Sequence, residues 1–506
     1  MLKRNLIANY LGQGWTALMG LAFIPVYINY LGIEAYGLIG MFALLTAWLS
    51  LLDMGMTPTL SREMARFTAG NHTAQSIRDL LRTLEFITLI IAALIAGGVA
   101  LGANWIARSW LQAEALPVEV VAQVFVIIGL VTALRFAESI YRSSIVGLQR
   151  QVLFNVVNSS LATVRGIGAV AILAWISPTI QAFFIWQGLL SIATLGILAS
   201  VTYASLPRAE RTARFSLESL RSVWRFAGGM IGITFLALLL TQVDKILLSK
   251  LLSLGDYGYY TLAAVVAGAL YMMIGPITQA FYPRLCEQHA RSDTGALIET
   301  YHKAAQLVSV LAGSTAIVVI LFPETLLLLW TQDQDLAART APLLSLLMLG
   351  NLLNGMMYMP YMTQLAHGWT SLTVKINIVA VLLIVPAILW VTPRYGAEGA
   401  AWVWVSLNAG YVIIGVHFMY RKILSTEKWR WYMQDLLMPL GAGLAASLLL
   451  KSVWLEADTV FTEFLLLGLA AVLTLGAALL AAGRVRRQTL QMVKPYWIRL
   501  KTKYEH

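Results

Sequence analysis

The sequence predicts an all-α membrane protein with about fourteen transmembrane helices. We expect two duplicated six-helix lobes around a central cavity, followed by two C-terminal helices. Composition is the first reason: 59% of the 506 residues are hydrophobic and only 12% are charged, about half the charged fraction of a soluble domain. The second reason is that apolar runs of about 20 residues, each able to cross a hydrocarbon layer about 30 Å thick, recur along the whole chain.

The apolar runs define the predicted spans in order. The first run follows Lys3 and Arg4 and is longer than the core of a signal peptide, so we expect it to be the first span. The fourteen predicted spans are 9–31, 37–57, 84–104, 118–141, 152–176, 180–204, 226–250, 258–282, 304–322, 340–363, 372–392, 399–419, 435–455 and 461–482.

The basic residues predict the orientation of these spans. The formal net charge is +11, which taken alone would also fit a nucleic-acid-binding surface. However, 28 of the 36 Lys and Arg residues fall in the segments that are cytoplasmic if the N-terminus is cytoplasmic. This bias is the positive-inside pattern of membrane proteins. We therefore predict that both termini are cytoplasmic and that nucleic acid is not a partner.

An internal repeat predicts the division into lobes. The stretch Leu31–Leu38 is matched 221 residues later by Leu252–Tyr259, and Gly147 is matched by Gly368 at the same offset. Six spans per repeat make the two repeats parallel, and such lobes usually enclose a cavity that opens to alternate sides of the membrane. The predicted parts are lobes 1–215 and 216–434, two further spans in 435–482 and a basic cytoplasmic tail, 483–506.

Several classes of function lack their signals in this sequence. No GxxxxGK[ST], HExxH or GxSxG motif is present, and no segment between spans is long enough for a soluble catalytic domain. The single Cys286 excludes a disulfide framework and a cysteine-based metal site. We predict a protein that is not an enzyme and has no cofactor, with H⁺ or Na⁺ as the coupling ions to consider.

Specific motifs resemble a known family. They are the Tyr-Gly pairs that open the second and eighth spans, Leu51-Leu-Asp-Met-Gly55, Val243-Asp-Lys-Ile-Leu-Leu and Gly258-Tyr-Tyr-Thr-Leu-Ala263. With the six-plus-six duplication they resemble polysaccharide flippases, the Wzx-type O-antigen transporters of the multidrug/oligosaccharidyl-lipid/polysaccharide exporter superfamily. The resemblance implies transfer of an undecaprenyl-diphosphate-linked oligosaccharide from the inner to the outer leaflet of a bacterial inner membrane.

Charges inside the seventh predicted span are candidate site residues. An ionised side chain at the bilayer centre costs at least about 2.5–3.5 kcal/mol, so it normally faces protein or a water-filled cavity. Lys245 shares a helical face with Thr234, Thr241 and Ser249, and we expect it to offer a point charge to the diphosphate. Asp244 lies about 100° away and could orient Lys245. The alternative is that both charges form ion pairs that hold helices together.

Arg165 lies about 13 residues into the fifth predicted span, near mid-membrane, with Asn155 and Asn158 on the same face. Its planar fork of donors suits diphosphate oxygens. The alternative is an ion pair with Glu85 or Glu138 inside the lobe. The series Arg135, Glu138 and Arg142, spaced by three and four residues, predicts local salt bridges along one helix.

A polar and aromatic stripe in the tenth predicted span is the candidate sugar site. Amides suit sugar hydroxyls, and aromatic faces suit the C–H side of a sugar ring. The stripe has spacings of three, four and three residues, as on one face of a helix, although such groups also hydrogen-bond helices together in lipid. Its members are Asn351, Asn354, Tyr358 and Tyr361.

Two further groups complete the predicted site. Arg62, Arg66 and Arg284 close spans on the inner side, where they follow the positive-inside pattern or attract an anionic head group to the inner mouth. Prolines kink helices, and spans one, two, seven and eight line the cleft in the resembled family. Pro25 and Pro276 are therefore candidate hinges, with static kinks as the alternative.

The leading hypothesis is a flippase that binds a lipid-linked glycan, contacts membrane lipids and works beside other polysaccharide assembly proteins. A cation-coupled multidrug exporter on the same scaffold would need an acidic cavity, whereas the deep charges here are mostly basic. A glycan polymerase or glycosyltransferase would need a larger outer loop or an acidic metal-binding cluster. A scaffold in a glycan assembly complex would not explain polar stripes inside the spans.

Overall fold

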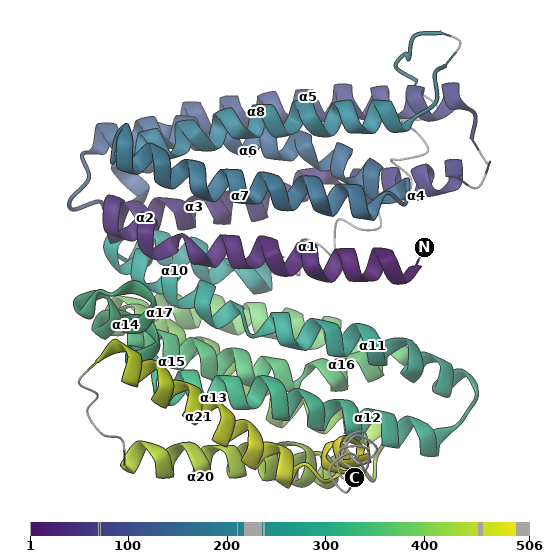
Figure 1. Cartoon of the computed structure of the whole chain (residues 1–506), viewed down its shortest axis with the longest axis vertical. Coiled ribbons are helices and arrows are strands. Elements are labelled where there is room, and N and C mark those ends of the chain that lie inside the picture. Colours follow the sequence, from purple (N-terminus) through teal and green to yellow (C-terminus); the bar gives the residue numbers. More distant parts are fainter. Residues whose placement is uncertain are drawn as a thin grey trace, which may run out of the picture. The chain divides into compact units, whose positions relative to one another are not determined.

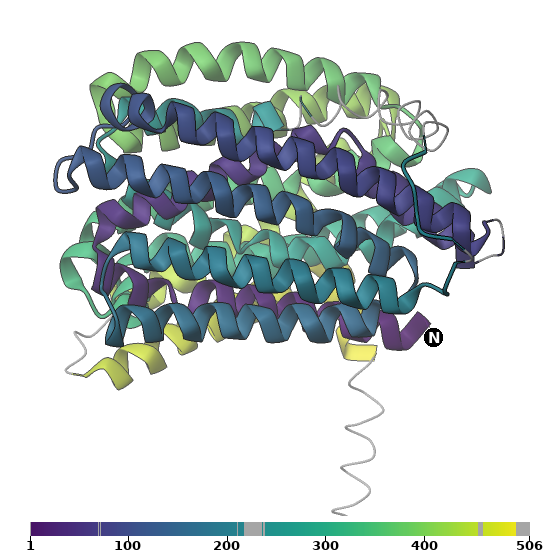
Figure 2. The ribbon, with the colours of Figure 1, turned by 90° about the horizontal axis from the view of Figure 1, so that it is seen from above.

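The computed structural model describes residues 2–68, 70, 72–209, 211–216, 235, 238–453 and 459–491. Contacts divide the chain into two compact units, Met1–Gly258 and Tyr259–His506. The helices within each unit run along a common direction, with the connecting loops at their two ends (Figure 1, Figure 2). The boundary between the contact-defined units falls later than the repeat boundary predicted at 215/216, which stays a prediction.

The N-terminal unit is helical from its first described residues onward. Within this unit, α6 packs against α4, α5 and α8. The elements are α1 (Leu2–Ala22), α2 (Ile24–Leu31), α3 (Ile33–Leu49), η1 (Ser50–Asp53), α4 (Met56–Thr68), α5 (Ala74–Trp105), η2 (Ile106–Trp110), α6 (Val118–Gly147), α7 (Gln151–Trp175) and α8 (Ile180–Ser205), followed by a helical stretch at 238–251 and by α10 (Leu254–Gly268), which crosses the unit boundary.

The C-terminal unit continues with helices of the same kind. In it α15 packs against α14 and α17, and α20 pairs with α21. The elements are α11 (Tyr271–Ala290), α12 (Thr294–Val308), η3 (Ser309–Gly313), α13 (Ser314–Leu321), α14 (Pro323–Thr331), α15 (Gln334–Met356), α16 (Tyr358–Ala366), α17 (Ser371–Gly410), η4 (Tyr411–Gly415), α18 (Val416–Lys422), α19 (Lys428–Arg430), η5 (Trp431–Leu437), α20 (Met438–Ser452) and α21 (Val460–Ala481).

Twelve helices in the described part of the chain are long and apolar enough to cross a membrane. They confirm the prediction of a multi-pass helical protein. The seventh predicted span, 226–250, lies largely outside the described residues. The eleventh and twelfth fall together in Ser371–Lys422, which bends at Gly396, where φ is 59° and ψ is −151°. The count of fourteen and the cytoplasmic termini stay predictions.

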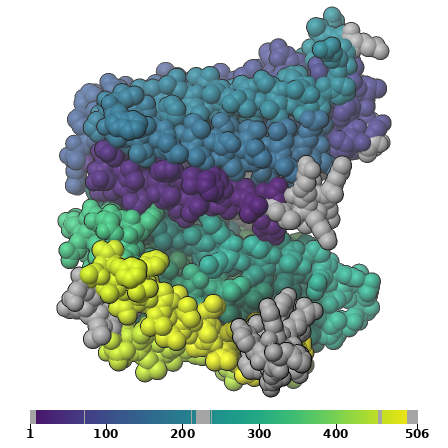
Figure 3. Space-filling model, viewed as in Figure 1, coloured from purple at the N-terminus to yellow at the C-terminus, as the bar shows by residue number. Residues whose placement is uncertain are grey.

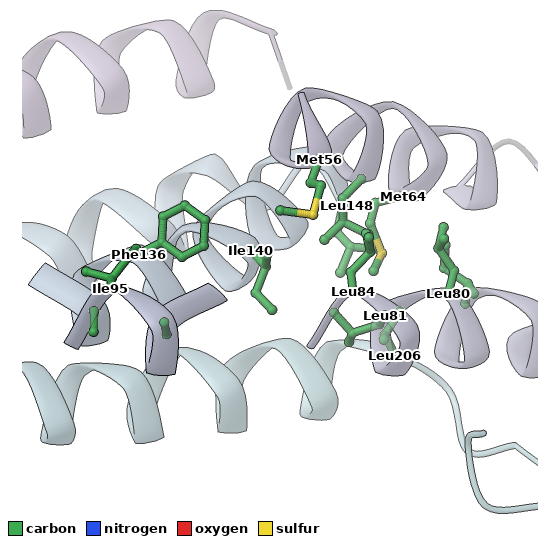
Figure 4. Packing of buried hydrophobic residues seen from close by; sticks show 14 residues of the cluster. Met56, Met64, Leu80, Leu81, Leu84, Ile95, Phe136, Ile140, Leu148 and Leu206 are labelled. Atoms are coloured by element: carbon green, nitrogen blue, oxygen red, sulfur yellow. The ribbon is translucent and has the colours of Figure 1, made fainter. Parts of the chain in front are cut away.

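A cluster of buried apolar side chains holds α4, α5 and α6 of the N-terminal unit together. Met56 and Met64 of α4, Leu81 of α5 and Phe136 and Ile140 of α6 belong to one buried cluster, which Figure 4 shows from close by. The α4 helix is outside the candidate spans and carries Arg62 and Arg66 on its other side. The cluster therefore fixes the position of a basic, amphipathic helix against the membrane-spanning helices.

The motif Leu51–Gly55 comprises most of η1 and the two-residue turn before α4. Met54 and Gly55 both have positive φ, at 46° and 77°, a region that side chains other than glycine rarely occupy. The carboxylate of Asp53 accepts hydrogen bonds from the backbone N–H of Thr57, at 3.2 Å, and from its hydroxyl, at 2.9 Å. Asp53 thus satisfies donors in the first turn of α4, and its role in the structure is that of a cap.

A glycine pair from the predicted repeats makes a symmetric contact within residues 1–258. A Cβ on Gly37 would lie 2.6 Å from the backbone oxygen of Leu254, and a Cβ on Gly258 would lie 2.4 Å from that of Ile33. Gly37 and Gly258 differ by 221 residues, and so do Ile33 and Leu254. The two close approaches are therefore related as by a twofold axis, as expected where parallel repeats meet.

The two candidate hinge prolines have different surroundings. Pro25 lies in the first turn of α2, directly after the break at Phe23 that separates α2 from α1. Pro276 lies inside α11, which is continuous around it, and the nearest interruption is at 269–270, between α10 and α11. The helix break thus coincides with the first proline and precedes the second by about two turns.

Candidate functional site

A cavity of about 800 Å³ lies inside the N-terminal unit, among α1, α2, α3, α6, α7 and α8. We call it the arginine cavity. Arg165, which the sequence analysis selected, meets polar side chains from several helices in this cavity. Its charged and amide-bearing lining residues are Arg135, Glu138, Arg142, Asn158, Arg165 and Gln187.

Two guanidinium groups in the arginine cavity share one neutral acceptor. Arg165 Nη1 and Arg135 Nη2 each lie 3.3 Å from Oε1 of Gln187 on α8. Arg135 also lies over the ring of Phe42, 4.6 Å from its centroid. An amide oxygen orients the two arginines but carries no charge, so the positive charge of both remains available to an anion.

Glu138 partly offsets the charge of the cavity. Its Oε2 makes an ion pair with Arg142 Nη2 at 2.9 Å, and Arg142 Nη1 donates to Oδ1 of Asn158 at the same distance. The prediction of a salt bridge within α6 is therefore confirmed for Glu138 and Arg142. It is wrong for Arg135, which turns to Gln187 and Phe42 instead because these side chains reach it from α8 and α3.

The formal charge of the lining is positive. Three arginines face one glutamate among the described lining residues, which leaves an excess of two positive charges. Neither Nε of Arg135 nor Oε1 of Glu138 has a hydrogen-bond partner in the described part of the chain, although both are buried. Buried polar atoms normally have a partner, so these two atoms leave capacity for water or for a ligand in the cavity.

The alternative partners predicted for Arg165 are engaged elsewhere. Glu85 accepts hydrogen bonds from the hydroxyls of Tyr141 and Tyr203, at 2.9 and 2.7 Å, and pairs with Arg82 at 3.0 Å. Arg165 makes no ion pair within 4 Å with any carboxylate of the described residues. Its guanidinium is thus oriented by Gln187 without being neutralised.

A second cavity, of about 440 Å³, lies between α1 and α7. We call it the amide pocket. Thr16 and Asn158 line both this pocket and the arginine cavity, so the two are adjacent. Its polar lining residues are Asn9, Gln13, Thr16, Gln151, Asn155 and Asn158.

The amides of this pocket form a ladder between two helices. Asn9 Nδ2 donates to Oε1 of Gln151 at 2.8 Å, Asn155 Nδ2 donates to Oδ1 of Asn9 at 2.6 Å, and Asn158 donates to the hydroxyl of Thr16 at 3.1 Å. Gly12 permits the approach, because a Cβ there would lie 2.3 Å from Oδ1 of Asn155. Figure 3 shows α1, in purple, on the surface of its unit.

Lys245 and Asp244 lie on the helical stretch 238–251, half-buried. Lys245 Nζ donates to the backbone oxygen of Thr241 at 3.1 Å and to Oε1 of Gln242 at 3.2 Å. The linings of the arginine cavity and the amide pocket do not include Lys245. Thr234, which was expected on the same face, lies outside the described residues. The structure therefore does not bring Lys245 and Arg165 together in either of these cavities.

The predicted sugar stripe belongs to a network between helices of the C-terminal unit. Tyr271 Oη donates to Oδ1 of Asn351 and of Asn354, at 3.3 and 3.1 Å, and Trp404 Nε1 donates to Oδ1 of Asn351 at 3.0 Å. Asn354 Nδ2 in turn donates to Oδ1 of Asn408 at 2.8 Å. These amides tie α15 to α11 and α17, which is the alternative use that the sequence left open.

The stripe is also interrupted. The α15 helix ends at Met356 and α16 begins at Tyr358, so the amides and the tyrosines sit on different helices. The Tyr358 ring lies 5.9 Å from that of Tyr271, and Tyr361 is 36% exposed. Tyr271 thus contacts both helices, through its hydroxyl to the amides of α15 and through its ring to Tyr358 of α16.

Arg62 and Arg66 gather around one carboxylate at the end of the N-terminal unit. Glu63 pairs with Arg62 at 2.8 Å, with Arg66 at 3.3 Å and with Nε2 of His72 at 2.7 Å. Burial alone would raise the pKa of Glu63, but the hydrogen bonds from His72 and Arg62 and the charges of both arginines outweigh it, so the pKa lies below its usual value. Arg284 is elsewhere, in a pocket of the C-terminal unit with Lys303.

The site contains residues that the sequence analysis did not select. Gln187 is a buried amide in the middle of a predicted span, and Asn9 and Gln13 are amides at the start of the first span. Buried amides within apolar runs are the signal that could have identified them. Arg135 and Arg142 were assigned a structural role because their spacing suits a single helix.

Comparison with known proteins assigns the chain to a family. The model of the family described as "Polysaccharide biosynthesis protein" matches residues 2–289, more than half of the chain. A relative from Shigella flexneri, named "Putative O-antigen transporter", is 19% identical over 408 residues, which cover 79% of this chain and 93% of the relative.

Solved structures resemble this one in fold. The lipid II flippase MurJ in an inward closed conformation superposes with a TM-score of 0.66 at 13% identity, over 93% of this chain and 97% of that chain. An inward-facing MATE-family multidrug resistance transporter of the MOP superfamily has a TM-score of 0.62 at 14% identity, over 83% and 96%. The family match, together with this fold, confirms the resemblance found in the sequence: the chain belongs to the polysaccharide biosynthesis protein family.

Proposed function

We propose that this protein is a flippase that moves an undecaprenyl-diphosphate-linked oligosaccharide, an O-antigen or related repeat unit, from the inner to the outer leaflet of a bacterial inner membrane. The observation that carries the proposal is a cavity with excess positive charge inside membrane-spanning helices, next to an amide-lined pocket. Membership of a polysaccharide biosynthesis family supports the same substrate class.

The arginine cavity suits the diphosphate. Arginine presents a rigid fork of donors that matches phosphate oxygens, and Arg135 and Arg165 are held by Gln187 without neutralisation. Taking a charged group out of water is costly unless opposite charges replace the solvent. An excess of two positive charges meets that requirement for an anion and opposes the entry of a cation.

The amide pocket suits the glycan. Asn and Gln side chains offer both donors and acceptors, as sugar hydroxyls do, and five of the six polar side chains of this pocket are amides. Because Thr16 and Asn158 belong to both cavities, one substrate can place its diphosphate against the arginines and its first sugars against the amides. The prenyl chain would remain in lipid.

Transport by alternating access requires binding that is reversible on both sides of the membrane. The two parallel repeats suggested by the sequence are suited to this mechanism. The driving force would be a gradient of H⁺ or Na⁺ or of the substrate itself. The positive-inside pattern favours cytoplasmic termini, which would place Asn9 and Gln151, at the starts of α1 and α7, on the cytoplasmic side.

The direct test replaces Arg165 and Arg135 by Gln, singly and together. We expect membrane insertion to be kept and glycan export to fall at least tenfold in each variant, measured as surface glycan in cells that lack the native gene. The control is Arg394→Gln, because Arg394 is an exposed arginine that lies over the ring of Trp390 outside both cavities. Full export by the double variant at normal membrane levels would contradict the proposal.

A multidrug exporter is the second candidate, because the fold is also that of MATE-family transporters. Export of cationic drugs would favour an acidic cavity, and the carboxylate of Glu138 is already paired with Arg142. We expect the protein to confer no resistance to cationic drugs when overproduced. Growth assays on a series of such drugs separate the two functions.

A further inference from the structure

A basic pocket at the end of the C-terminal unit has no part in the function proposed above. It measures about 290 Å³ and lies among α11, α12 and the helical residues 483–491, which follow α21. We call it the α11–α12 pocket. Six of its lining residues carry the argument: Phe281, Arg284, Lys303, Leu307, Val485 and Gln488.

Two cations line this pocket, and its described lining contains no carboxylate. Arg284 is exposed and Lys303 is half-buried, and neither makes an ion pair or side-chain hydrogen bond within the described part of the chain. Two like charges beside one small pocket repel each other, and the repulsion grows where water is partly excluded. A bound anion would relieve this repulsion, and the Gln488 amide supplies a further donor.

The nearby carboxylates are occupied by other arginines. Glu287, one turn after Arg284, pairs with Arg291 at 2.7 Å. Glu299, one turn before Lys303, pairs with Nε of Arg484 at 3.0 Å. No carboxylate among the described residues therefore neutralises Arg284 or Lys303.

The walls of the pocket are apolar on the remaining sides. Phe281, Leu307 and Val485 offer hydrocarbon surface directly beside the charges. A free phosphate ion would gain nothing from such walls, whereas the glycerol and first acyl carbons of a phospholipid would bury apolar area against them. The combination of two cations and apolar walls indicates a lipid rather than a soluble anion.

The pocket is held in shape by the segment after α21. Val485 is buried in a cluster with Val310, Ala478 and Ala482. The backbone N–H of Arg484 donates to Oε1 of Gln306 at 2.9 Å. These contacts fix helical residues 483–491 against α12, so the pocket does not have to be ordered by its ligand.

The pocket lies near one end of its helices, where lipid head groups are expected. The candidate span Leu254–Ala290 is interrupted at 269–270, but its 37 residues exceed the roughly 20 that cross the hydrocarbon core, so its end can reach the head-group region. Arg284 lies six residues before its end. Arg486 and Arg487, which are exposed, directly follow Val485 in the sequence. Each basic residue near an anionic membrane surface strengthens the attraction to that surface.

We propose that the α11–α12 pocket binds the phosphate head group of an anionic phospholipid, with Arg284 and Lys303 as its charge partners. The additional helix α21 and the residues after it then have a specific task, because they complete a lipid site on the C-terminal unit. The site lies in the other unit from the arginine cavity, and the proposal does not depend on transport of a glycan.

The test measures lipid binding to the purified full-length protein by native mass spectrometry, with phosphatidylglycerol and phosphatidylcholine of equal chain length as probes. We expect phosphatidylglycerol to bind about tenfold more tightly, a difference of about 1.4 kcal/mol. The double variant Arg284→Gln/Lys303→Gln should lose this preference. The variant Arg284→Lys/Lys303→Arg keeps both charges and should retain most of it.

A matched control removes two other exposed positive charges of the C-terminal unit, with Arg394→Gln and Arg421→Gln, and should keep the preference. Thermal unfolding of each variant shows whether the fold is retained. An unchanged preference in the Arg284/Lys303 double Gln variant would overturn the proposal. So would displacement of phosphatidylglycerol by inorganic phosphate at similar concentration, which indicates a free-anion site, or selective binding of undecaprenyl diphosphate, which indicates a substrate site.

Discussion

Gln187 is the neutral acceptor that two arginines of the arginine cavity share. Its single amide oxygen accepts from Arg135 and Arg165, so it orients two cations that would otherwise repel each other. A carboxylate at the same position would orient them equally well but would cancel one positive charge. We therefore expect replacement of the Gln187 amide by a carboxylate to change the affinity of the cavity for an anion more than it changes the structure.

This reasoning gives a prediction for Gln187→Glu. The new carboxylate should pair with both arginines, keep or raise the unfolding temperature, and lower glycan export at least tenfold, because the anion must now compete with an internal one. Export and thermal unfolding of the purified protein are the two measurements.

The matched variant is Gln187→Leu, which removes the acceptor and adds no charge. We expect it to be less stable than the native protein and to keep more export than Gln187→Glu. Equal export by Gln187→Glu and the native protein would show that the charge of this cavity does not govern transport.

At the scale of elements, a buried ionic cluster connects α12 to the segment that precedes α20. His302 on α12 is fully buried, and its Nε2 contacts Glu427 at 2.9 Å while its Nδ1 contacts Asp435 of η5. Gln306 Nε2 donates to Oδ1 of Asp435 at 3.0 Å. These groups lie where the two additional C-terminal helices join the unit.

The cluster explains how a polar helix segment can pack inside a membrane protein. With a carboxylate at each ring nitrogen, both nitrogens act as donors when the imidazole is protonated. The arrangement gives each carboxylate a partner at a place that is shielded from solvent. Removal of the histidine would leave the fully buried Asp435 without its main partner, while Glu427 keeps Arg430 at 3.2 Å. This is a more severe change than the loss of one exposed ion pair.

We therefore predict that His302→Leu lowers the free energy of unfolding by about 3–5 kcal/mol, measured by thermal or chemical unfolding in detergent. His417→Leu is the control, because His417 is exposed and contacts Lys428 only at the surface. We expect the control to change stability by less than about 0.5 kcal/mol. A similar, small effect of both substitutions would mean that the cluster does not hold the segment in place.

At the scale of the whole molecule, the two stretches predicted to be repeats meet at Gly37 and Gly258. Each glycine lies against a backbone oxygen from the other repeat, at Leu254 and Ile33. Because backbone atoms cannot rotate away as a side chain can, a Cβ at either position must separate the two helices. The contact is thus one place where the duplication has a direct structural use.

The symmetry of this contact predicts equal effects from its two halves. Gly37→Ala and Gly258→Ala should each destabilise the protein by about 1–3 kcal/mol, and the double substitution should cost less than their sum, because one displacement accommodates both methyl groups. Thermal unfolding is the measurement. Gly268→Ala, at a helical position where the Cβ meets nothing within 4 Å, should be neutral or stabilising.

Much of the fold could be predicted from the sequence. Apolar runs of membrane-spanning length predicted the spans, because a helix in lipid must satisfy its own backbone and show an apolar surface. The Tyr-Gly openings predicted a repeat whose glycines meet in the structure. The turn at Leu51–Gly55 was visible as a motif, but its role as a cap for α4 was not.

The candidate site could be predicted only in part. Arg165 was selected because a charge in mid-span is expensive, and this physical reason holds for any arrangement of helices. Asn351 and Asn354 were selected because amides at helical spacing suit sugar hydroxyls, yet they hydrogen-bond Tyr271 and Trp404. Periodicity identifies the face of a helix that a residue occupies, but not whether that face meets a cavity or another helix.

The sequence by itself determined that the protein lies in a membrane, approximately where its spans are, and that it resembles polysaccharide flippases. Hydropathy, charge and motifs can be read from short stretches of chain. Only the tertiary structure decided that Arg135, Arg165 and Gln187 form one cavity and that Lys245 is outside it. The physical reason is that these three side chains come from α6, α7 and α8, and only helix packing brings such distant residues within hydrogen-bond distance.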